Sequence, residues 1–426
     1  MAVRAAGVAE GEGRQVLGCA AAGFAIMASW YVLRPLRDAL GLGEGAARLP
    51  ALVLATLAAT LVASAVVSAL VGRLSRRRFL TILYHFFVAN LLAFWLLFRS
   101  PAAAGWPFLG RAFFVWASVF NLLAVSLFWA LMADLWRREQ AARLFGLLSL
   151  GGSLGAVAGS AFAAHAASRL RPATTLLLAA LLLELALAGM RGLAGAAPAP
   201  KTGAAGETPA PAERVAPGRL AALVRSPYLA SVCGYVVLYT LTSTIVYLLQ
   251  GHVVARAVLG TGPRAALFAR IDLGVNLLTL LGQLFLTGRV LVRLGVATAL
   301  VLLPVLTGGG LAWLALAPTV ATLAVFQVLR RSTDYVFAKP ARDVLFTVLP
   351  SADKYRAKSF IDTFLYRGGD GLGAWLFGLL APRIGAPGLA VLAVPICAGW
   401  AVLGWSLGRR HLRAGEPRTE PRILES

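Results

Sequence analysis

The chain has 426 residues, of which 59% are apolar and 14% are charged, and its mean hydropathy is +0.77. A water-soluble domain does not carry so apolar a composition, which predicts an integral membrane protein with several spans. The formal net charge is +22, but more than half of the 40 Lys and Arg residues fall in segments expected on the inner side. This basic excess therefore indicates membrane topology, and a nucleic-acid partner is not expected.

Twelve stretches are apolar enough to cross a hydrocarbon core of about 30 Å, which takes roughly 20 residues of helix. In chain order they lie near 15–34, 48–71, 79–98, 108–134, 143–166, 172–190, 227–254, 265–288, 294–316, 319–349, 357–381 and 386–408. Residues 191–226, rich in Ala, Pro and Gly, predict an extended linker between the sixth and seventh spans.

These elements predict an all-α integral membrane protein in which twelve transmembrane helices form two six-helix bundles. The expected divisions are an N-terminal bundle at 1–190, a cytoplasmic linker at 191–226, a C-terminal bundle at 227–410 and a cytoplasmic tail at 411–426. This layout resembles the major facilitator superfamily. Both termini are expected in the cytoplasm and the protein in the plasma (cell inner) membrane, as a monomer with lipid around it.

The first span carries Arg34 and Arg37 near its predicted outer end. Two explanations stay open for these cations. The side chains could reach along the helix to the membrane surface, because long basic side chains often do so. Alternatively, they could form a cationic site in a central cavity, where guanidinium groups bind carboxylate or phosphate. Pro35 between them favours the second explanation.

The fifth and seventh spans carry two further patterns. Gly151, Gly155 and Gly159 repeat at every fourth position, which predicts a close helix contact. In the seventh span, three tyrosines and a serine form a stripe that predicts either helix packing or stacking against a flat ligand. These residues are Tyr235, Tyr239, Ser243 and Tyr247.

The eighth span lines up Asp272, Asn276 and Gln283 at helical spacing on an otherwise apolar rod. Polar residues inside a membrane helix usually face a partner or a watery path, since an unpaired charge there costs about 2.5–3.5 kcal/mol. This stripe is therefore expected to face a water-filled path.

The tenth span is the richest in charge, with Arg330, Arg331 and Asp334 followed by Lys339 and Asp343. The pairs Arg330–Asp334 and Lys339–Asp343 are four residues apart, so each pair could neutralise itself along one helical face. The alternative is an anion site, because cations outnumber anions here. Pro340 removes a helical hydrogen bond in the middle of the cluster and favours that alternative.

The eleventh span places Arg367 and Asp370 beside Gly368, Gly369, Gly371 and Gly373. The glycines permit close helix contact or a bend. Arg367 and Asp370 could pair with each other at a spacing of three residues, or could serve a central site. The three cysteines, Cys19, Cys233 and Cys397, lie in separate spans without metal-ligand spacing, so neither a metal nor a cofactor is expected.

Four motifs resemble those of the ATP/ADP translocases, the nucleotide transport proteins of plastids and obligate intracellular bacteria. "LRPLRD" at 33–38 is similar to the family's L-R-D-T-K-D, and "FWALMAD" with "EQAARLF" is similar to its fourth span and following loop. "DYVFAKPARD" at 334–343 is similar to K-Y-x-x-F-D-P-x-K-E. Arg356, Lys358, Asp362 and Arg367 match the family's eleventh-span pattern. Three positions depart from the family, because Asp334 and Lys339 invert its charges and Asp370 replaces a lysine.

The resemblance implies a distant relative of the major facilitator superfamily that exchanges ATP for ADP, with Arg37 meeting phosphate. Together with the charges inside the spans, it predicts a substrate site for an anionic metabolite such as ATP or ADP and no enzymatic activity. The candidate residues are Arg34, Arg37, Asp134, Asp272, Asn276, Arg330, Arg331, Arg342, Arg367 and Asp370. Asp134, Asp272 and Asp370 would balance the arginines in the empty site.

Three other functions stay open. A proton-coupled transporter of another organic solute would use Asp272 or Asp370 as its titrating group. A membrane-embedded transferase is disfavoured, because no His/Asp or Cys/His constellation and no phosphate-binding glycine loop is present. A membrane scaffold or sensor without transport activity is the third.

Overall fold

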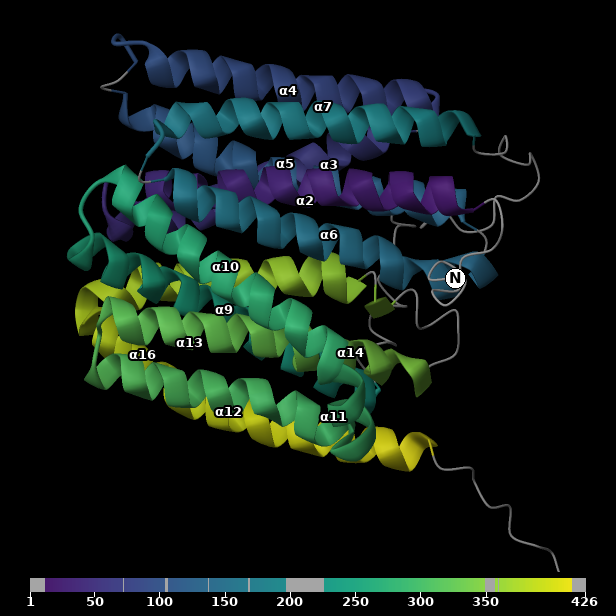
Figure 1. The fold of residues 1–426 in the computed structure, drawn as a ribbon. Helices are drawn as coiled ribbons and strands as arrows, with labels where there is room; N and C mark the ends of the chain where they lie inside the picture. Colours follow the sequence, from purple (N-terminus) through teal and green to yellow (C-terminus); the bar gives the residue numbers. More distant parts are fainter. Residues whose placement is uncertain are drawn as a thin grey trace, which may run out of the picture. The chain divides into compact units, whose positions relative to one another are not determined.

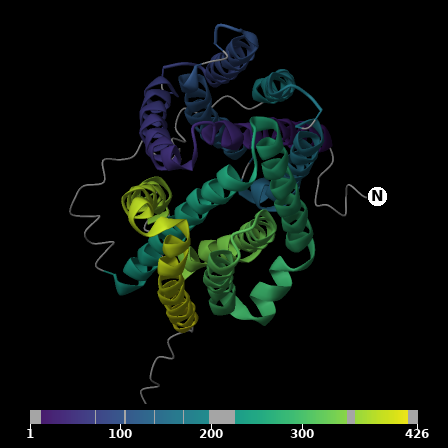
Figure 2. The same cartoon turned by 90° about the vertical axis from the view of Figure 1, so that its left-hand side faces the viewer.

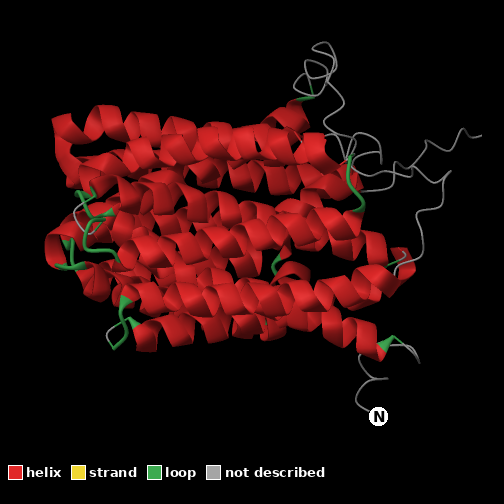
Figure 3. Ribbon diagram, turned by 90° about the horizontal axis from the view of Figure 1, so that it is seen from above, coloured by secondary structure: helices red, strands yellow, loops and turns green. Residues whose placement is uncertain are grey.

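The computed structural model describes residues 12–71, 73–103, 106–136, 138–167, 169–196, 226–348, 357–358 and 360–415. These residues form helices joined by short turns, and no β-strand occurs among them (Figure 3). Most of the predicted linker and of the predicted C-terminal tail lies outside the described residues.

The described residues before the linker form six long helices (Figure 1). They are α2 (Gly13–Gly41), α3 (Leu49–Val71), α4 (Arg76–Arg99), α5 (Pro107–Leu135), α6 (Arg138–Ala166) and α7 (Pro172–Ala196), with a short 3-10 turn at Ala46–Arg48 before α3. Each corresponds to one of the first six predicted spans. The predicted first span is too short, since α2 continues seven residues beyond Arg34.

The helices after the linker are more broken. They are α9 (Pro227–Ala257), α10 (Thr261–Phe285), α11 (Thr287–Arg293), α12 (Gly295–Leu316), α13 (Val320–Thr333), a π-helical turn η2 (Asp334–Ala338), α14 (Lys339–Val344), a 3-10 turn η3 (Leu345–Val348), a second π-helical turn η4 (Ile361–Leu365) and α16 (Tyr366–Gly415). One π-helical turn falls in each of the two predicted spans that carry the most charged residues, the tenth and the eleventh.

Ten helices of the described part are long and apolar enough to cross a membrane. One of them, Tyr366–Arg413, covers both the predicted eleventh and twelfth spans. Gly385 inside it has a φ of 71°, which interrupts the helix, and Figure 1 draws the segment as two helices that turn back on each other. The predicted tenth span forms α13, η2 and α14 and is not among these ten. The predicted fold is thereby confirmed as an all-α integral membrane protein with twelve helices.

The chain divides into two compact units. The first contains Met1–Glu213 together with Gln250–Leu280, and the second contains Arg214–Leu249 together with Leu281–Ser426. The end of α9 and most of α10 thus pack with the helices that precede the linker. The predicted bundle boundaries at 190 and 227 follow the linker in sequence and stay a prediction.

Helix α2 is central in the first unit and contacts α5, α6 and α7, which lie near it in Figure 1 and are shown turned by 90° in Figure 2. Its close contact with α6 depends on glycines, which have no side chain to separate the two backbones. A methyl group on Gly151, Gly155 or Gly159 would overlap the backbone of α2 at Ala20, Phe24 or Ala28. The glycine pattern of the fifth span is therefore confirmed as a close helix contact.

In the second unit, α12 packs along α16, and glycines again permit close approach. A methyl group on Gly369 or Gly373 of α16 would overlap Thr240 or Thr244 of α9. The glycines of the eleventh span therefore bring α16 against the face of α9 that carries the tyrosine stripe. Trp400, fully buried, packs against Tyr235 and Tyr239 with ring centroids 5.4 and 6.1 Å apart.

Candidate functional site

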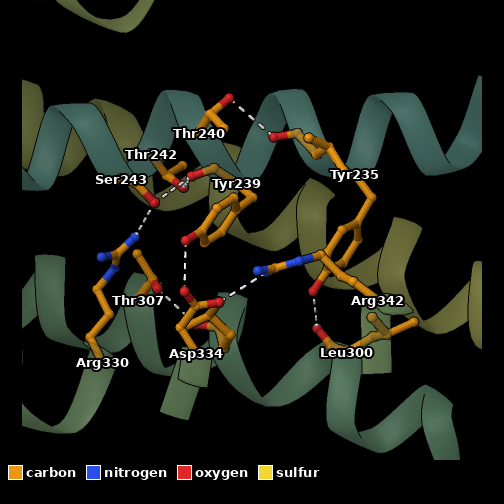
Figure 4. Close-up of polar contacts among 12 residues, drawn as sticks. Tyr235, Tyr239, Thr240, Thr242, Ser243, Leu300, Thr307, Arg330, Asp334 and Arg342 are labelled. Carbon is orange, nitrogen blue, oxygen red and sulfur yellow. Dashed lines mark hydrogen bonds and ion pairs between the residues drawn. The ribbon is translucent and has the colours of Figure 1, made fainter. Parts of the chain in front are cut away.

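The second unit holds a buried polar cluster in the tenth-span region, where α13 gives way to the π-helical turn η2. We call Tyr239, Ser243, Arg330, Asp334 and Arg342 the Arg330–Arg342 cluster (Figure 4). The π-helical turn ends just before Pro340, which lies in the first turn of α14. A proline inside a helix supplies no backbone N–H and crowds the preceding turn, so the helix there departs from ordinary α geometry. This departure turns Asp334 toward α9.

Asp334 is held from two sides. Its Oδ2 accepts a hydrogen bond of 2.6 Å from the Tyr239 hydroxyl, and its Oδ1 accepts one of 3.0 Å from Arg342 Nη1 (Figure 4). The Arg342 guanidinium also lies over the Tyr239 ring, 4.2 Å from the ring centroid. Asp334 and Arg342 are both buried. Because hydrogen bonds to charged groups are strong in a dry environment, these contacts hold the carboxylate, the guanidinium and the ring in fixed positions relative to one another.

Arg330 lies beside Asp334, Arg342 and Tyr239 and is hydrogen-bonded to a neutral group. Its Nη2 donates to the Ser243 hydroxyl at 2.6 Å, and Ser243 in turn donates to the Tyr239 carbonyl oxygen (Figure 4). The side chain is buried, with 6% of Arg330 exposed, and its Nε makes no hydrogen bond within the described residues. The cluster therefore contains two guanidinium groups and one carboxylate, and it carries an excess positive charge.

These contacts differ from the intrahelical pairs that were one of the two explanations of the tenth span. Asp334 pairs with Arg342, eight residues later, and Asp343 pairs with Lys358 at 2.8 Å. The alternative pairs Arg330–Asp334 and Lys339–Asp343 assumed a regular α-helix. The π-helical turn changes the register between the two, so the spacing of four residues no longer decides which groups meet.

The tyrosine stripe of α9 faces this cluster. Tyr235 donates its hydroxyl proton to the Leu300 carbonyl oxygen at 2.7 Å, and Tyr239 and Ser243 contact the charged groups directly. Of the two explanations of the stripe, helix packing describes Tyr235. Tyr239 has a polar role in the cluster that neither explanation anticipated.

Further along α9, Thr244 donates a hydrogen bond of 3.0 Å to the carboxylate of Asp370 on α16. Arg367 is partly buried on the preceding turn of the same helix, α16. This contact joins two helices, because the glycines of α16 bring its backbone close to that of α9. The pairing of Arg367 with Asp370 stays a prediction. Arg331, next to Arg330 in α13, is also partly buried.

The first unit holds a second charged cluster, which we call the Arg34–Asp272 network and which consists of Arg34, Arg37, Asp38 and Asp272. Arg37 contacts Asp38 Oδ1 through Nη2 at 2.5 Å and through Nε at 3.0 Å, and its Nη1 donates to Ser118 at 3.2 Å. Its guanidinium also lies 5.2 Å from the Trp30 ring and 5.1 Å from the Phe114 ring. The structure thus holds Arg37 firmly within the protein.

Arg34 links helices α2 and α10 in the same network. Its Nη1 lies 3.4 Å from Asp272 Oδ1, and its Nε lies 4.0 Å from Asp38 Oδ2. Asp272 is 2% exposed. Helix α2 continues to Gly41, which leaves Arg34 about 10 Å from the helix end, and the contact with Asp272 favours a role within the protein over the membrane surface. The network contains two arginines and two aspartates, so its charges balance.

Asn276 lies one helical turn after Asp272 on α10. Its Nδ2 lies 3.2 Å from the Ala156 carbonyl oxygen and 3.3 Å from Ser160 Oγ on α6. The polar stripe of the eighth span thus contacts polar groups of α2 and α6, whereas a water-filled path was expected. Gln283, further along α10, has a side chain that is largely exposed and donates to the Tyr335 carbonyl oxygen at 3.4 Å.

The predicted site residues therefore fall into separate groups. Arg330 and Arg342 belong to one cluster of the second unit, and Arg34, Arg37 and Asp272 belong to one network of the first. Asp134 is exposed near the end of α5. Sequence reasoning missed Ser118 and Thr244, whose only signal is a hydroxyl inside an apolar span. Arg356 and the side chain of Asp362 lie outside the described residues.

Solved transporter structures share this fold over nearly their whole length. The nucleoside transporter NupG is similar with a TM-score of 0.66 at 12% identity, covering 93% of this chain and 99% of that one. A POT family transporter in complex with 5-aminolevulinic acid gives 0.64 at 12% identity, covering 93% and 96%. A D-xylose-proton symporter gives 0.59 at 13% identity, covering 95% and 97%.

The chain matches no protein-family model and no curated protein sequence. The structural likeness therefore establishes the fold, which this chain shares with NupG and the other solved transporters. At 12–13% identity, it does not extend to the substrate of this chain.

Proposed function

We propose that this protein is a secondary active transporter that exchanges nucleotides of the ATP/ADP type, or a related phosphorylated metabolite, by alternating access. It would work in the plasma (cell inner) membrane with both termini in the cytoplasm, and it would not be an enzyme. The observation that carries the proposal is the buried Arg330 guanidinium, which hydrogen-bonds to neutral Ser243 beside an Asp334 carboxylate already held by Arg342 and Tyr239.

An excess buried cation is costly. Removing a charge from water without a well-placed counter-ion costs several kcal/mol, and polar or charged groups inside membrane helices are usually associated with substrate or ion pathways. A bound anion would supply the missing charge. The planar guanidinium fork matches phosphate and carboxylate oxygens, and the buried Nε of Arg330 still lacks an acceptor within the described residues.

Exchange follows from the same charge excess. A site that keeps an uncompensated cation when empty is costly to enclose away from water, whereas a loaded site is nearly neutral. The loaded protein would therefore change between inward-open and outward-open states more easily than the empty one. Strict counter-exchange of one anion for another is the expected transport mode.

The two charged groups would then have different roles. Arg330, Arg331, Arg342 and Arg367 of the second unit are the proposed anion-binding residues. Arg34, Arg37, Asp38 and Asp272 form a charge-balanced network, so their proposed role is to hold α2 and α10 together in one conformation of the transport cycle. The predicted phosphate contact of Arg37 is not retained, because Asp38, Ser118 and two aromatic rings already surround it.

A proton-coupled transporter of another organic solute is the second candidate. The observation that favours it is the set of buried or partly buried carboxylates in membrane helices, namely Asp272, Asp334 and Asp370. One structure of similar fold is a D-xylose-proton symporter. Protonation of one such carboxylate, rather than binding of a substrate anion, would then alter the charge balance.

Exchange in liposomes separates the two candidates. Purified protein is reconstituted with ADP inside, labelled ATP is added outside, and uptake is compared with liposomes that contain no nucleotide. The proposal predicts uptake that needs internal ADP and persists when an uncoupler removes the proton gradient. Uptake that needs a proton gradient and ignores internal ADP would favour the proton-coupled candidate.

A further inference from the structure

A cavity lined by cations lies in the second unit, beside the Arg330–Arg342 cluster. The cavity has a volume of about 150 Å³ and lies between α9, α14 and the start of the eleventh-span region. Its charged lining residues are Lys339, Arg342, Asp343 and Lys358. Aromatic rings, including those of Tyr235 and Phe346, form part of its wall. Of these residues only Arg342 belongs to the Arg330–Arg342 cluster.

The charged residues lie at different depths. Lys358 and Asp343 form an ion pair of 2.8 Å whose side chains are 45% and 50% exposed, so they lie at the mouth. Lys339 is also exposed, whereas the Arg342 side chain is 8% exposed and forms the inner wall. Among the described residues, three cations and one carboxylate therefore line the cavity, which favours an anionic ligand that enters from the mouth.

The volume limits the size of that ligand. The cavity is several times larger than the roughly 30 Å³ that one water molecule takes in the liquid. A single phosphoryl group fits this space. Lysine binds phosphate as a point charge and arginine through a planar fork, so Lys339, Lys358 and Arg342 together suit a tetrahedral oxyanion.

We propose that this cavity is a binding site for one phosphoryl-type oxyanion. Asp343 pairs with Lys358 in the empty site, and the bound anion takes the place of Asp343. The anion is either free inorganic phosphate or the terminal phosphate of a larger substrate, and only the second source depends on the transport function proposed above. Arg342 connects this cavity to Asp334, so an anion bound here would draw the guanidinium away from that carboxylate.

Substitutions of the two partners of the Lys358–Asp343 pair should change phosphate affinity in opposite directions. Asp343 competes with the anion for Lys358, so Asp343→Asn should tighten phosphate binding, and Lys358→Gln should weaken it. Each change should be up to about fivefold, which is the size expected for a partly exposed charge pair. A purely structural ion pair would leave phosphate affinity unaltered, and both variants would lower the melting temperature.

Full-length protein in detergent is titrated with inorganic phosphate by calorimetry at constant ionic strength, with chloride as the counter-ion. Glu44→Gln, which removes the partner of Arg111 elsewhere in the chain, is the matched control and should not alter phosphate affinity. Opposite shifts for the two cavity variants support the site. Unaltered affinity in both, shifts in the same direction, or no phosphate binding by the unmodified protein would overturn it.

Titration with ADP distinguishes the two sources. If Lys358→Gln weakens ADP binding as it weakens phosphate binding, the site receives the phosphate of the substrate. If only phosphate binding weakens, the site receives the free anion, and the proposal still stands. Both titrations measure binding without transport, so a failure of ATP/ADP exchange in liposomes would leave this test intact.

Discussion

Arg342 pairs with Asp334, eight residues before it, with Nη1 and Oδ1 3.0 Å apart. Eight residues of regular α-helix would separate the two by about 12 Å along the axis and would rotate them apart. The π-helical turn Asp334–Ala338 lies between them and alters both distance and direction. This irregular turn therefore determines which cation of the tenth-span region is neutralised, and it leaves Arg330 bonded to neutral Ser243.

Asp334→Asn should be strongly destabilising. Removing one partner of a buried ion pair leaves the other charge uncompensated, which costs about 3–5 kcal/mol. Asp343→Asn, at the exposed pair with Lys358, should cost less than about 1 kcal/mol. Thermal unfolding in detergent, followed by tryptophan fluorescence, compares the two. Equal melting temperatures for both variants would mean that Asp334 does not neutralise Arg342.

Tyr239→Phe and Tyr235→Phe each remove one phenolic hydroxyl group, and the two hydroxyls have different partners. Tyr239 donates to the Asp334 carboxylate, and Tyr235 donates to the neutral Leu300 carbonyl oxygen. Hydrogen bonds to charged groups contribute about 1.5–3 kcal/mol and neutral ones about 0.5–1.5 kcal/mol, so Tyr239→Phe should unfold at a lower temperature. It should also alter the affinity for anionic substrate, whereas Tyr235→Phe should not. The same affinity in both variants would remove Tyr239 from the site.

Arg34 and Asp272 should be coupled. Arg34→Gln and Asp272→Asn each leave a buried charge without this partner, whereas the double variant removes both charges. The double variant should therefore be more stable than the sum of the single losses predicts, by about 0.5–3 kcal/mol. A double-mutant cycle of unfolding free energies measures this term. Simple additivity would show that the 3.4 Å contact does not contribute.

Gly155→Ala should weaken the contact between α2 and α6. A methyl group at Gly155 would overlap the Phe24 carbonyl oxygen, so the two backbones would have to separate. Gly146 lies on the same helix with nothing within 4 Å of an added methyl group, so Gly146→Ala should be neutral or stabilising, by up to about 1 kcal/mol. Comparing the melting temperatures of the two variants tests the close contact; a normal melting temperature for Gly155→Ala would disprove it.

The fold could be predicted from sequence because lipid imposes one simple requirement. A spanning helix must satisfy its own backbone hydrogen bonds and bury apolar side chains, so long apolar runs and their breaks locate the helices. Glycine spacing also predicted the α2–α6 contact, because only close packing demands small residues at every fourth position. Even the break at Gly385 fell between two predicted spans.

The partners of individual charges could not be predicted in the same way. Asp334 has cations both four and eight residues away in sequence, and residue spacing alone does not locate the π-helical turn that brings Arg342 to it. Likewise, the pairing of Arg34 with Asp272 joins residues more than 200 positions apart, for which the sequence carries no spacing signal.

The most direct test of the central claim is the affinity of the protein for ADP and for adenosine, which differ only in the charged phosphates. Thermal-shift titration would be done on the unmodified protein, on Arg330→Gln, and on the matched control Arg383→Gln, whose guanidinium donates to a carbonyl oxygen at the exposed end of its helix. The account predicts that ADP stabilises the unmodified protein and the control, that adenosine does not, and that Arg330→Gln weakens ADP binding at least about tenfold. Equal stabilisation by adenosine and ADP, or full ADP affinity in Arg330→Gln, would contradict it.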